Sequence, residues 1–234
     1  MLGACRSTTP SVKQFDAGSK QSAMREPRSG QTAGADSLAS VLPRVEAAPL
    51  REALRSVSAA LRSFPDRSMI IGGVAVIAHG VARTTHDVDA TLATNRDIAQ
   101  IFGALERFDI YPRTEDALAL ARARQELELR HRTSGVDVDL SLAWTPFELD
   151  ALAAAEDMLL GSVEVTVARA EDLVLYKAQR WGPRDQHDVE QLVALHGRAM
   201  DLGRIRRVVA ELGDDGERAR DVERVVERGL GLAQ

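Results

Sequence analysis

The hydrophobic pattern of the chain begins near position 45. Residues 1–44 are rich in Ser, Gly, Thr, Gln and Ala and show no apolar periodicity. Such a composition buries too little apolar surface to offset the entropy of ordering, so it predicts a disordered tail. From 45 to 64, apolar residues recur three or four positions apart, which predicts an amphipathic helix. This spacing is carried by Leu50, Leu54, Val57 and Leu61.

The middle of the chain alternates between strand and helix periodicity. The expected strands are 69–71, 87–92, 109–113, 125–132, 136–143 and 162–167. The expected helices are 74–79, 96–107, 115–122 and 145–160. Asn95 is expected to cap the helix that follows it, and Pro146 to occupy the first turn of the last helix.

From residue 170 onward the pattern is helical throughout. Glycine, aspartate and proline separate four expected helices, at 171–180, 184–196, 202–212 and 217–229. Strands and helices alternate first and helices follow, which indicates an α/β (α+β) fold. We predict a small mixed β-sheet with flanking helices over 45–169, followed by a helical C-terminal segment over 170–234.

Composition excludes several classes of protein. No run of about 18 apolar residues is present, which excludes a transmembrane helix, and Cys5 is the only cysteine, which excludes a disulfide framework. We therefore expect a cytoplasmic protein without a membrane partner. The net charge of −5 argues against a generally basic nucleic-acid coat, but it is compatible with a local basic channel. Arginine greatly outnumbers lysine, and this bias with many alanines suggests a bacterial source.

Paired acidic residues are the main candidates for chemistry. Asp87 and Asp89 are two apart on an expected strand, so both side chains leave the same face. Neighbouring carboxylates repel each other unless a cation lies between them, and Mg²⁺ prefers oxygen ligands of this kind together with substrate phosphates. Asp137 and Asp139 share one face of another expected strand, and either could supply a third carboxylate. The pattern predicts a site for two Mg²⁺ ions.

Three further features suit the binding of phosphates. Gly72-Gly73 lets the backbone approach a phosphate closely, at the start of a helix with free N–H groups. Lys177 is the only lysine after residue 20, and its compact ammonium suits a triphosphate. Arg83 precedes the acidic strand and is expected either to neutralise it or to contact phosphate. Together with the carboxylates, these residues predict nucleotidyl transfer.

Four ordered motifs then carry a resemblance to a known family. They are Gly72-Gly73, Asp87-Val88-Asp89, the pair Asp172 and Lys177, and Arg184-Asp185-Gln186-His187-Asp188. The first two resemble the DNA polymerase β-like nucleotidyltransferase superfamily, in which a glycine motif begins a helix and Asp-x-Asp lies on the next strand. All four are similar to the AbiEii toxin-like branch of that superfamily. The similarity covers residues 68–195.

The resemblance implies an enzyme that moves a nucleoside monophosphate from an NTP to an acceptor hydroxyl, on tRNA or on a protein. It also implies a toxin with a cognate antitoxin. Lys177 would then contact phosphates, and Asp185 or Asp188 would orient Lys177 or the nucleotide. Gly73 departs from the serine of the wider superfamily, so a hydroxyl contact is expected to be missing. The residues that follow the strand, including the Thr145-Pro146 helix start, favour Asp139 over Asp137 as the third carboxylate.

Other readings of the same residues stay open at this point. The chain could be a non-catalytic nucleotide-binding or interaction protein on the same fold, or a kinase-like phosphotransferase. The acidic strands could be solvated faces. Asp185 and Asp188 could serve only as helix caps, and Arg83 could form only an ion pair.

Overall fold

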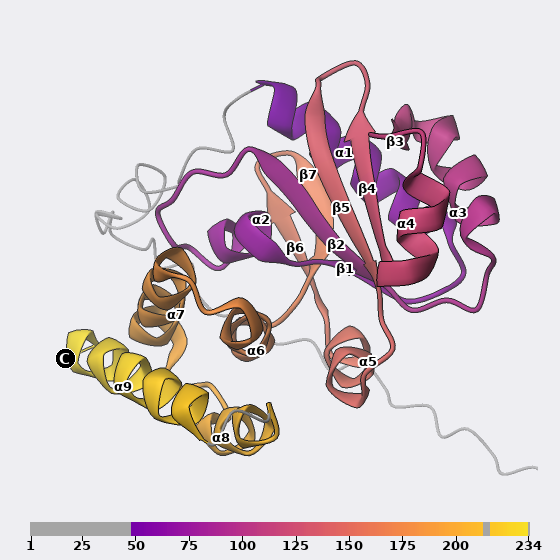
Figure 1. The fold of residues 1–234 in the computed structure, drawn as a ribbon. Helices are drawn as coiled ribbons and strands as arrows, with labels where there is room; N and C mark the ends of the chain where they lie inside the picture. Colours follow the sequence, from indigo (N-terminus) through magenta and orange to yellow (C-terminus); the bar gives the residue numbers. More distant parts are fainter. Residues whose placement is uncertain (1–47, 213–215, 234) are drawn as a thin grey trace, which may run out of the picture.

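The computed structural model describes residues 48–212 and 216–233, so the predicted tail over 1–44 lies outside the described residues. A seven-stranded mixed sheet has the order β3-β4-β5-β2-β1-β7-β6 (Figure 1). The strands are β1 Ser68–Ile70, β2 Asp87–Leu92, β3 Ile110–Pro112, β4 Glu126–His131, β5 Val136–Leu142, β6 Glu156–Leu160 and β7 Val163–Val167. The predicted mixed sheet with flanking helices is confirmed.

The register of the central strands decides where the acidic residues lie. Strands β2 and β5 pair in parallel, with Asp87 opposite Asp137 and Asp89 opposite Asp139. Val88 and Val138, between the acids, are buried on the other face. Because apolar and acidic residues alternate, the carboxylates of both strands lie on one face of the sheet.

Five helices and one 3₁₀ turn accompany the strands in the N-terminal part of the described chain. They are α1 Ala48–Ser63, α2 Gly72–Ala78, α3 Ile98–Leu105, η1 Glu106–Phe108, α4 Ala117–Arg124 and α5 Pro146–Ala153. Helix α1 lies behind the sheet in Figure 1, and its predicted apolar stripe is buried there. Helix α2 follows β1 directly, so the double glycine begins a helix as predicted.

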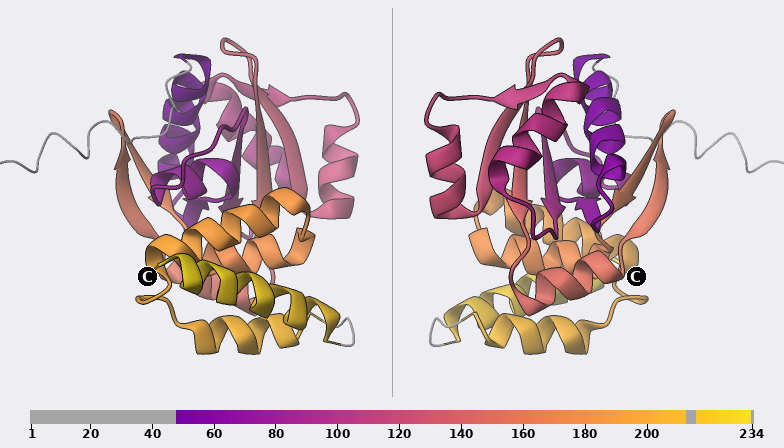
Figure 2. Two further views of the ribbon diagram at one scale, coloured as in Figure 1. Left: turned by 90° about the vertical axis from the view of Figure 1, so that its left-hand side faces the viewer. Right: turned by 90° about the vertical axis from the view of Figure 1, so that its right-hand side faces the viewer.

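The helical C-terminal part gathers at one end of the sheet, as both views of Figure 2 show. Its helices are α6 Ala170–Arg180, α7 Pro183–His196, α8 Leu202–Ala210 and α9 Glu217–Leu232. Helix α6 packs against α2 as well as against α7 and α8, and α7 packs against α9. Helix α6 is thus the element that brings C-terminal residues to the double glycine.

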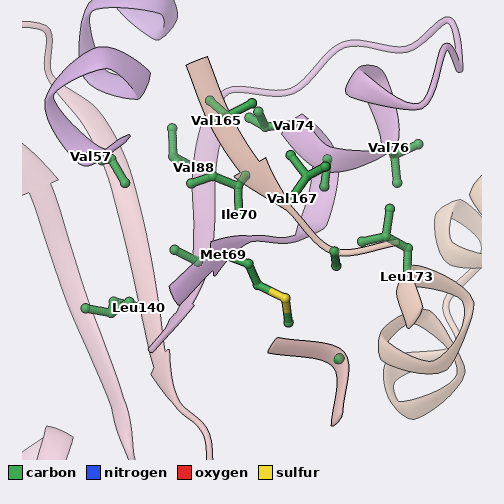
Figure 3. Close-up of a cluster of buried hydrophobic side chains, with 14 of the residues drawn as sticks. Val57, Met69, Ile70, Val74, Val76, Val88, Leu140, Val165, Val167 and Leu173 are labelled. Atoms are coloured by element: carbon green, nitrogen blue, oxygen red, sulfur yellow. The ribbon is translucent and has the colours of Figure 1, made fainter. Parts of the chain in front are cut away.

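The core is aliphatic. Figure 3 shows buried side chains from α1, β1, α2, β2, β5, β7 and α6 that meet in one cluster. Met69, Val74, Val88, Val167 and Leu173 in this cluster have no exposed surface. Among the described residues, no helix has the length and apolar character needed to cross a bilayer.

Two local predictions were wrong. The helix expected over 145–160 ends at Ala153, and residues 156–160 form the edge strand β6 instead. Gly161 has a φ of +63°, and it lets the chain turn back so that β6 pairs with β7 as a hairpin. Asn95 does not cap α3. Asp97 does, because its side chain accepts a hydrogen bond from the Ala99 N–H at 2.8 Å.

Candidate active site

The double glycine lies directly against the acidic strand β2. Gly72 has a φ of +61°, a left-handed conformation that glycine adopts without strain. A Cβ at this position would lie 2.7 Å from Asp89 Cβ and would overlap the Asp89 carboxylate. The Ile71 N–H donates to the Asp89 carbonyl at 2.9 Å, which fixes this close approach. Gly72 is therefore required both by the backbone and by the position of Asp89.

Gly73 makes room for Thr85, a residue that the sequence reasoning did not single out. A Cβ at position 73 would lie 2.8 Å from Thr85 Cβ and would overlap its hydroxyl. That hydroxyl donates to Asp87 Oδ1 at 2.6 Å. The hydroxyl beside the double glycine thus comes from the loop before β2 and not from position 73. Only the nearness of Thr85 to Asp87 in sequence could have pointed to it.

Arg113, at the end of β3, bridges the two candidates for the third carboxylate. Its Nη1 lies 3.1 Å from Asp137 Oδ2, and its Nη2 donates to Asp139 Oδ1. Asp137 also accepts from Arg130 Nε at 2.7 Å. The hydrogen bond from Arg130 is the main cause that lowers the pKa of Asp137. Asp137 therefore pairs with two arginines, Arg113 and Arg130. Asp139 pairs with Arg113 and lies opposite Asp89.

Two acids on this face of the sheet, Asp89 and Asp139, resist ionisation. Burial raises the pKa of Asp89, and the neighbouring charge of Asp87 raises it further. Burial also raises the pKa of Asp139 to about 6, against the opposing effect of Arg113. Deprotonated carboxylates in this setting are stabilised by a cation, and their oxygens are the donors that Mg²⁺ prefers. Asp87 and Asp89 present such oxygens on one face of β2.

The structure does not gather three acids into one metal-binding group. Within residues 48–212 and 216–233, no three His, Cys, Asp or Glu side chains are placed to hold a single metal ion. Asp139 instead turns its Oδ1 to Arg113. Coordination by Asp87, Asp89 and Asp139 together stays a prediction.

The predicted phosphate-binding residues meet in one ion-pair network. Lys177 Nζ lies 3.1 Å from Asp185 Oδ1 and 2.9 Å from Asp188 Oδ2. Arg83 Nη1 also pairs with Asp188 Oδ2. The Asp188 side chain is 1% exposed, so it is a buried anion between two cations from distant parts of the sequence. Asp185 pairs with Lys177 and also accepts from the Gly182 N–H at 3.0 Å, so it caps α7.

A cavity of about 220 Å³ connects these parts of the site. One portion of its lining comes from Gly72, Asp89, Lys177 and Asp185. Other lining residues are Arg124, Gln125, Glu126, Trp144, Tyr176, Gln179 and Arg180. The sheet, the start of α2 and helix α6 thus contribute to one concave site, and Asp89 and Lys177 both line it.

Comparison with known proteins shows the family of the chain. A family model described as a nucleotidyltransferase of unknown function, DUF6036, matches residues 50–225. The chain belongs to this family of nucleotidyltransferases. No curated protein matches the chain.

Several solved structures resemble this DUF6036 protein at low identity. An antigenic nucleotidyltransferase-like protein from Paracoccidioides brasiliensis is 15% identical, with 76% of this chain and 92% of that chain covered and a TM-score of 0.45. The antibiotic-resistance factor ANT(2'')-Ia is 16% identical, with 76% and 89% covered and a TM-score of 0.42. The Thermotoga maritima CCA-adding enzyme, complexed with tRNA, is 12% identical, with 81% and 54% covered and a TM-score of 0.33.

Asp172 and Lys177, which form one motif of the sequence, lie in different environments in the DUF6036 structure. Asp172 is fully buried and pairs with Arg169 at 2.9 Å and with Arg204. Five helical residues correspond to about 500° of rotation, so Asp172 and Lys177 leave α6 in different directions. Asp172 joins α6 to α8, and Lys177 lines the cavity.

Proposed function

We propose that this DUF6036 protein is a Mg²⁺-dependent enzyme that moves a nucleoside monophosphate from an NTP to an acceptor hydroxyl. The observation that carries the proposal is that Gly72, Asp89 and Lys177 line one cavity. Backbone N–H groups at the start of a helix, a carboxylate and an ammonium are groups that bind a triphosphate and its metal ions. We expect the cavity to bind the NTP.

The triphosphate would be held from two sides. The backbone of Gly72 and Gly73 would approach it from the start of α2, and Lys177 would contact it from α6. Asp185 and Asp188 hold the Lys177 ammonium at 3.1 and 2.9 Å, so they would orient it toward the phosphates. Arg83 would act through Asp188, because its guanidinium pairs with that buried carboxylate.

Asp87 and Asp89 would hold two Mg²⁺ ions, with Asp139 completing one of the two sites. Bound Mg²⁺ would neutralise charge on the phosphates and on the attacking oxygen. The acceptor oxygen forms a bond to the α-phosphorus, the bond to the β-phosphate oxygen breaks, and pyrophosphate leaves. Asp139 lies opposite Asp89 and would help to activate the acceptor hydroxyl, whose proton passes to solvent.

The test is to follow label from NTPs carrying ³²P at either the α- or the γ-phosphate, with Mg²⁺, total RNA and cell proteins. We expect the α-label to appear on an acceptor and Asp89→Ala to abolish the transfer. Asp97→Ala is the matched control, because Asp97 caps α3 and does not line the cavity. Transfer that survives Asp89→Ala contradicts the proposal. Transfer of the γ-label would indicate a phosphotransferase, and NTP binding without transfer would indicate a non-catalytic protein.

We further propose a biological role as the toxin of an AbiEii-type system in the bacterial cytoplasm, with tRNA or a protein as acceptor and a cognate antitoxin as partner. Its support is the order of the four sequence motifs, from Gly72-Gly73 to Asp188. Induced expression should arrest growth, and Asp89→Ala should restore it. Growth that stops equally with both forms would contradict the toxin role.

A further inference from the structure

One of the two tryptophans of the chain is exposed at the cavity. The Trp144 side chain is 75% exposed, whereas Trp181 is 8% exposed. An indole left in water forgoes the favourable burial of a large apolar surface. Trp144 is also part of the lining that contains Asp89 and Lys177. An aromatic surface therefore lies open beside the groups proposed to hold phosphate.

The backbone of Trp144 is firmly held. It lies between β5 and α5, and its N–H donates to Glu148 Oε2 at 3.2 Å. The same Glu148 carboxylate accepts from the Thr145 N–H at 3.0 Å as part of a capping box at the start of α5. A residue that is fixed before a ligand arrives loses less conformational entropy when the ligand binds.

The cavity is suited to a single small molecule that contacts both Lys177 and Trp144. Its volume is about 220 Å³, which is at the small end for a cleft that binds a small molecule. Lys177 and Gly72 would bind the phosphates of such a molecule. The part of the molecule beyond its phosphates would then contact the other lining residues. In an NTP, that part is the ribose and a flat aromatic base.

We propose that Trp144 stacks on the base of the bound NTP. This inference rests on the proposed function, and it adds the subsite for the base. Stacking on an indole uses the face of the base, which all four bases possess. Trp144 should therefore strengthen the binding of every NTP and distinguish little between them.

The test compares the binding of Mg²⁺ complexes of the four NTPs with that of inorganic tripolyphosphate, by calorimetry. We expect Trp144→Ala to weaken the binding of each NTP about tenfold, within the range measured for base stacking. Trp144→Phe should bind nearly as well as the wild type, and tripolyphosphate should bind all forms equally. Leu149→Ala is the matched control, since Leu149 is exposed on α5 and does not line the cavity.

The outcomes separate this inference from the function on which it rests. A wild-type protein that binds neither NTP nor tripolyphosphate would overturn the proposed function. A wild-type protein that binds NTP no more tightly than Trp144→Ala would overturn the stacking alone, as would an equal loss of tripolyphosphate binding. A readout that needs no alanine variant is the fluorescence of the wild type. NTP should quench the exposed Trp144 and leave emission from the buried Trp181, and unquenched emission at saturating NTP would contradict the inference.

Discussion

Asp89 and Asp139 lie opposite each other in the parallel pairing of β2 and β5, and burial raises the pKa of both. The charge of Asp89 contributes to the shift at Asp139. In this structure the Arg113 guanidinium provides the positive charge next to Asp139. The register of the two strands thus places two partly buried acids side by side, where a nearby cation favours their ionised forms.

The first prediction concerns stability against pH in the metal-free protein. The folded state raises the pKa of Asp139 from 3.8 to about 6, so it holds the proton more tightly than the unfolded chain does. The stability contributed by this group is therefore fully present below about pH 4 and is lost as the pH rises through 6. Asp139→Asn stays neutral, so its free energy of unfolding should rise relative to wild type between pH 4 and 8, by up to about 3 kcal/mol. Urea unfolding in a chelator at several pH values measures this.

Asp137→Asn is a control for which the expected change in the free energy of unfolding has the opposite sign. Its partner Arg130 lowers the pKa of Asp137, so the ionised carboxylate stabilises the fold above the unfolded pKa. This variant should lose stability relative to wild type at neutral pH, and the loss should shrink as the solution is acidified. Parallel pH profiles for the two variants would contradict the opposite environments of these two acids.

A second prediction separates backbone strain from displacement of Asp89. Gly72→Ala places a side chain at a φ of +61° and against the Asp89 carboxylate. Gly135→Ala meets the same kind of strain at a φ of +71°, with nothing within 4 Å of the added Cβ. Each should lose about 1–2 kcal/mol from left-handed strain, and Gly72→Ala should lose more. Gly72→Ala alone should also abolish nucleotidyl transfer, and unchanged transfer would contradict a role for this close approach.

The central part of the site could be predicted because local patterns determined it. Asp87 and Asp89 alternate with buried valine and alanine, and this spacing alone places both carboxylates on one face. The double glycine after a short apolar strand predicted the turn into α2. Lys177 drew attention because it is the only lysine after residue 20, among many arginines. Each of these signals lies within a few neighbouring residues.

The missed features depend on contacts between distant segments. Arg113 reaches Asp139 only because β3 pairs with β4 and β4 with β5, and no local pattern distinguishes it from the other arginines. The edge strand β6 was missed because its pairing with β7 overrides helical spacing. Asp172 and Lys177 stand in one sequence motif, but the structure pairs Asp172 with Arg204 on α8.

A third prediction follows from the burial of Asp172. Its side chain is fully buried between Arg169 and Arg204, so Asp172→Ala leaves the Arg204 guanidinium, which is 17% exposed, without its carboxylate. Removal of one partner from a buried ion pair costs about 3 kcal/mol, so the unfolding midpoint in urea should fall clearly. Where the variant remains folded at low temperature, NTP binding should stay close to wild type. A specific loss of NTP affinity without a loss of stability would instead place Asp172 in the nucleotide site.

The fourth prediction distinguishes the two cations that share Asp188. Lys177 and Arg83 both pair with this buried carboxylate, but only Lys177 is part of the cavity lining. Lys177→Met and Arg83→Met should each reduce the free energy of unfolding, because each leaves Asp188 with one cation. Lys177→Met should in addition remove most of the binding of Mg²⁺–NTP and of tripolyphosphate, whereas Arg83→Met should weaken it less. Urea unfolding and calorimetry on the same preparations measure both effects. If Arg83→Met lost binding as completely as Lys177→Met, Arg83 would contact the phosphates itself and would not act through Asp188.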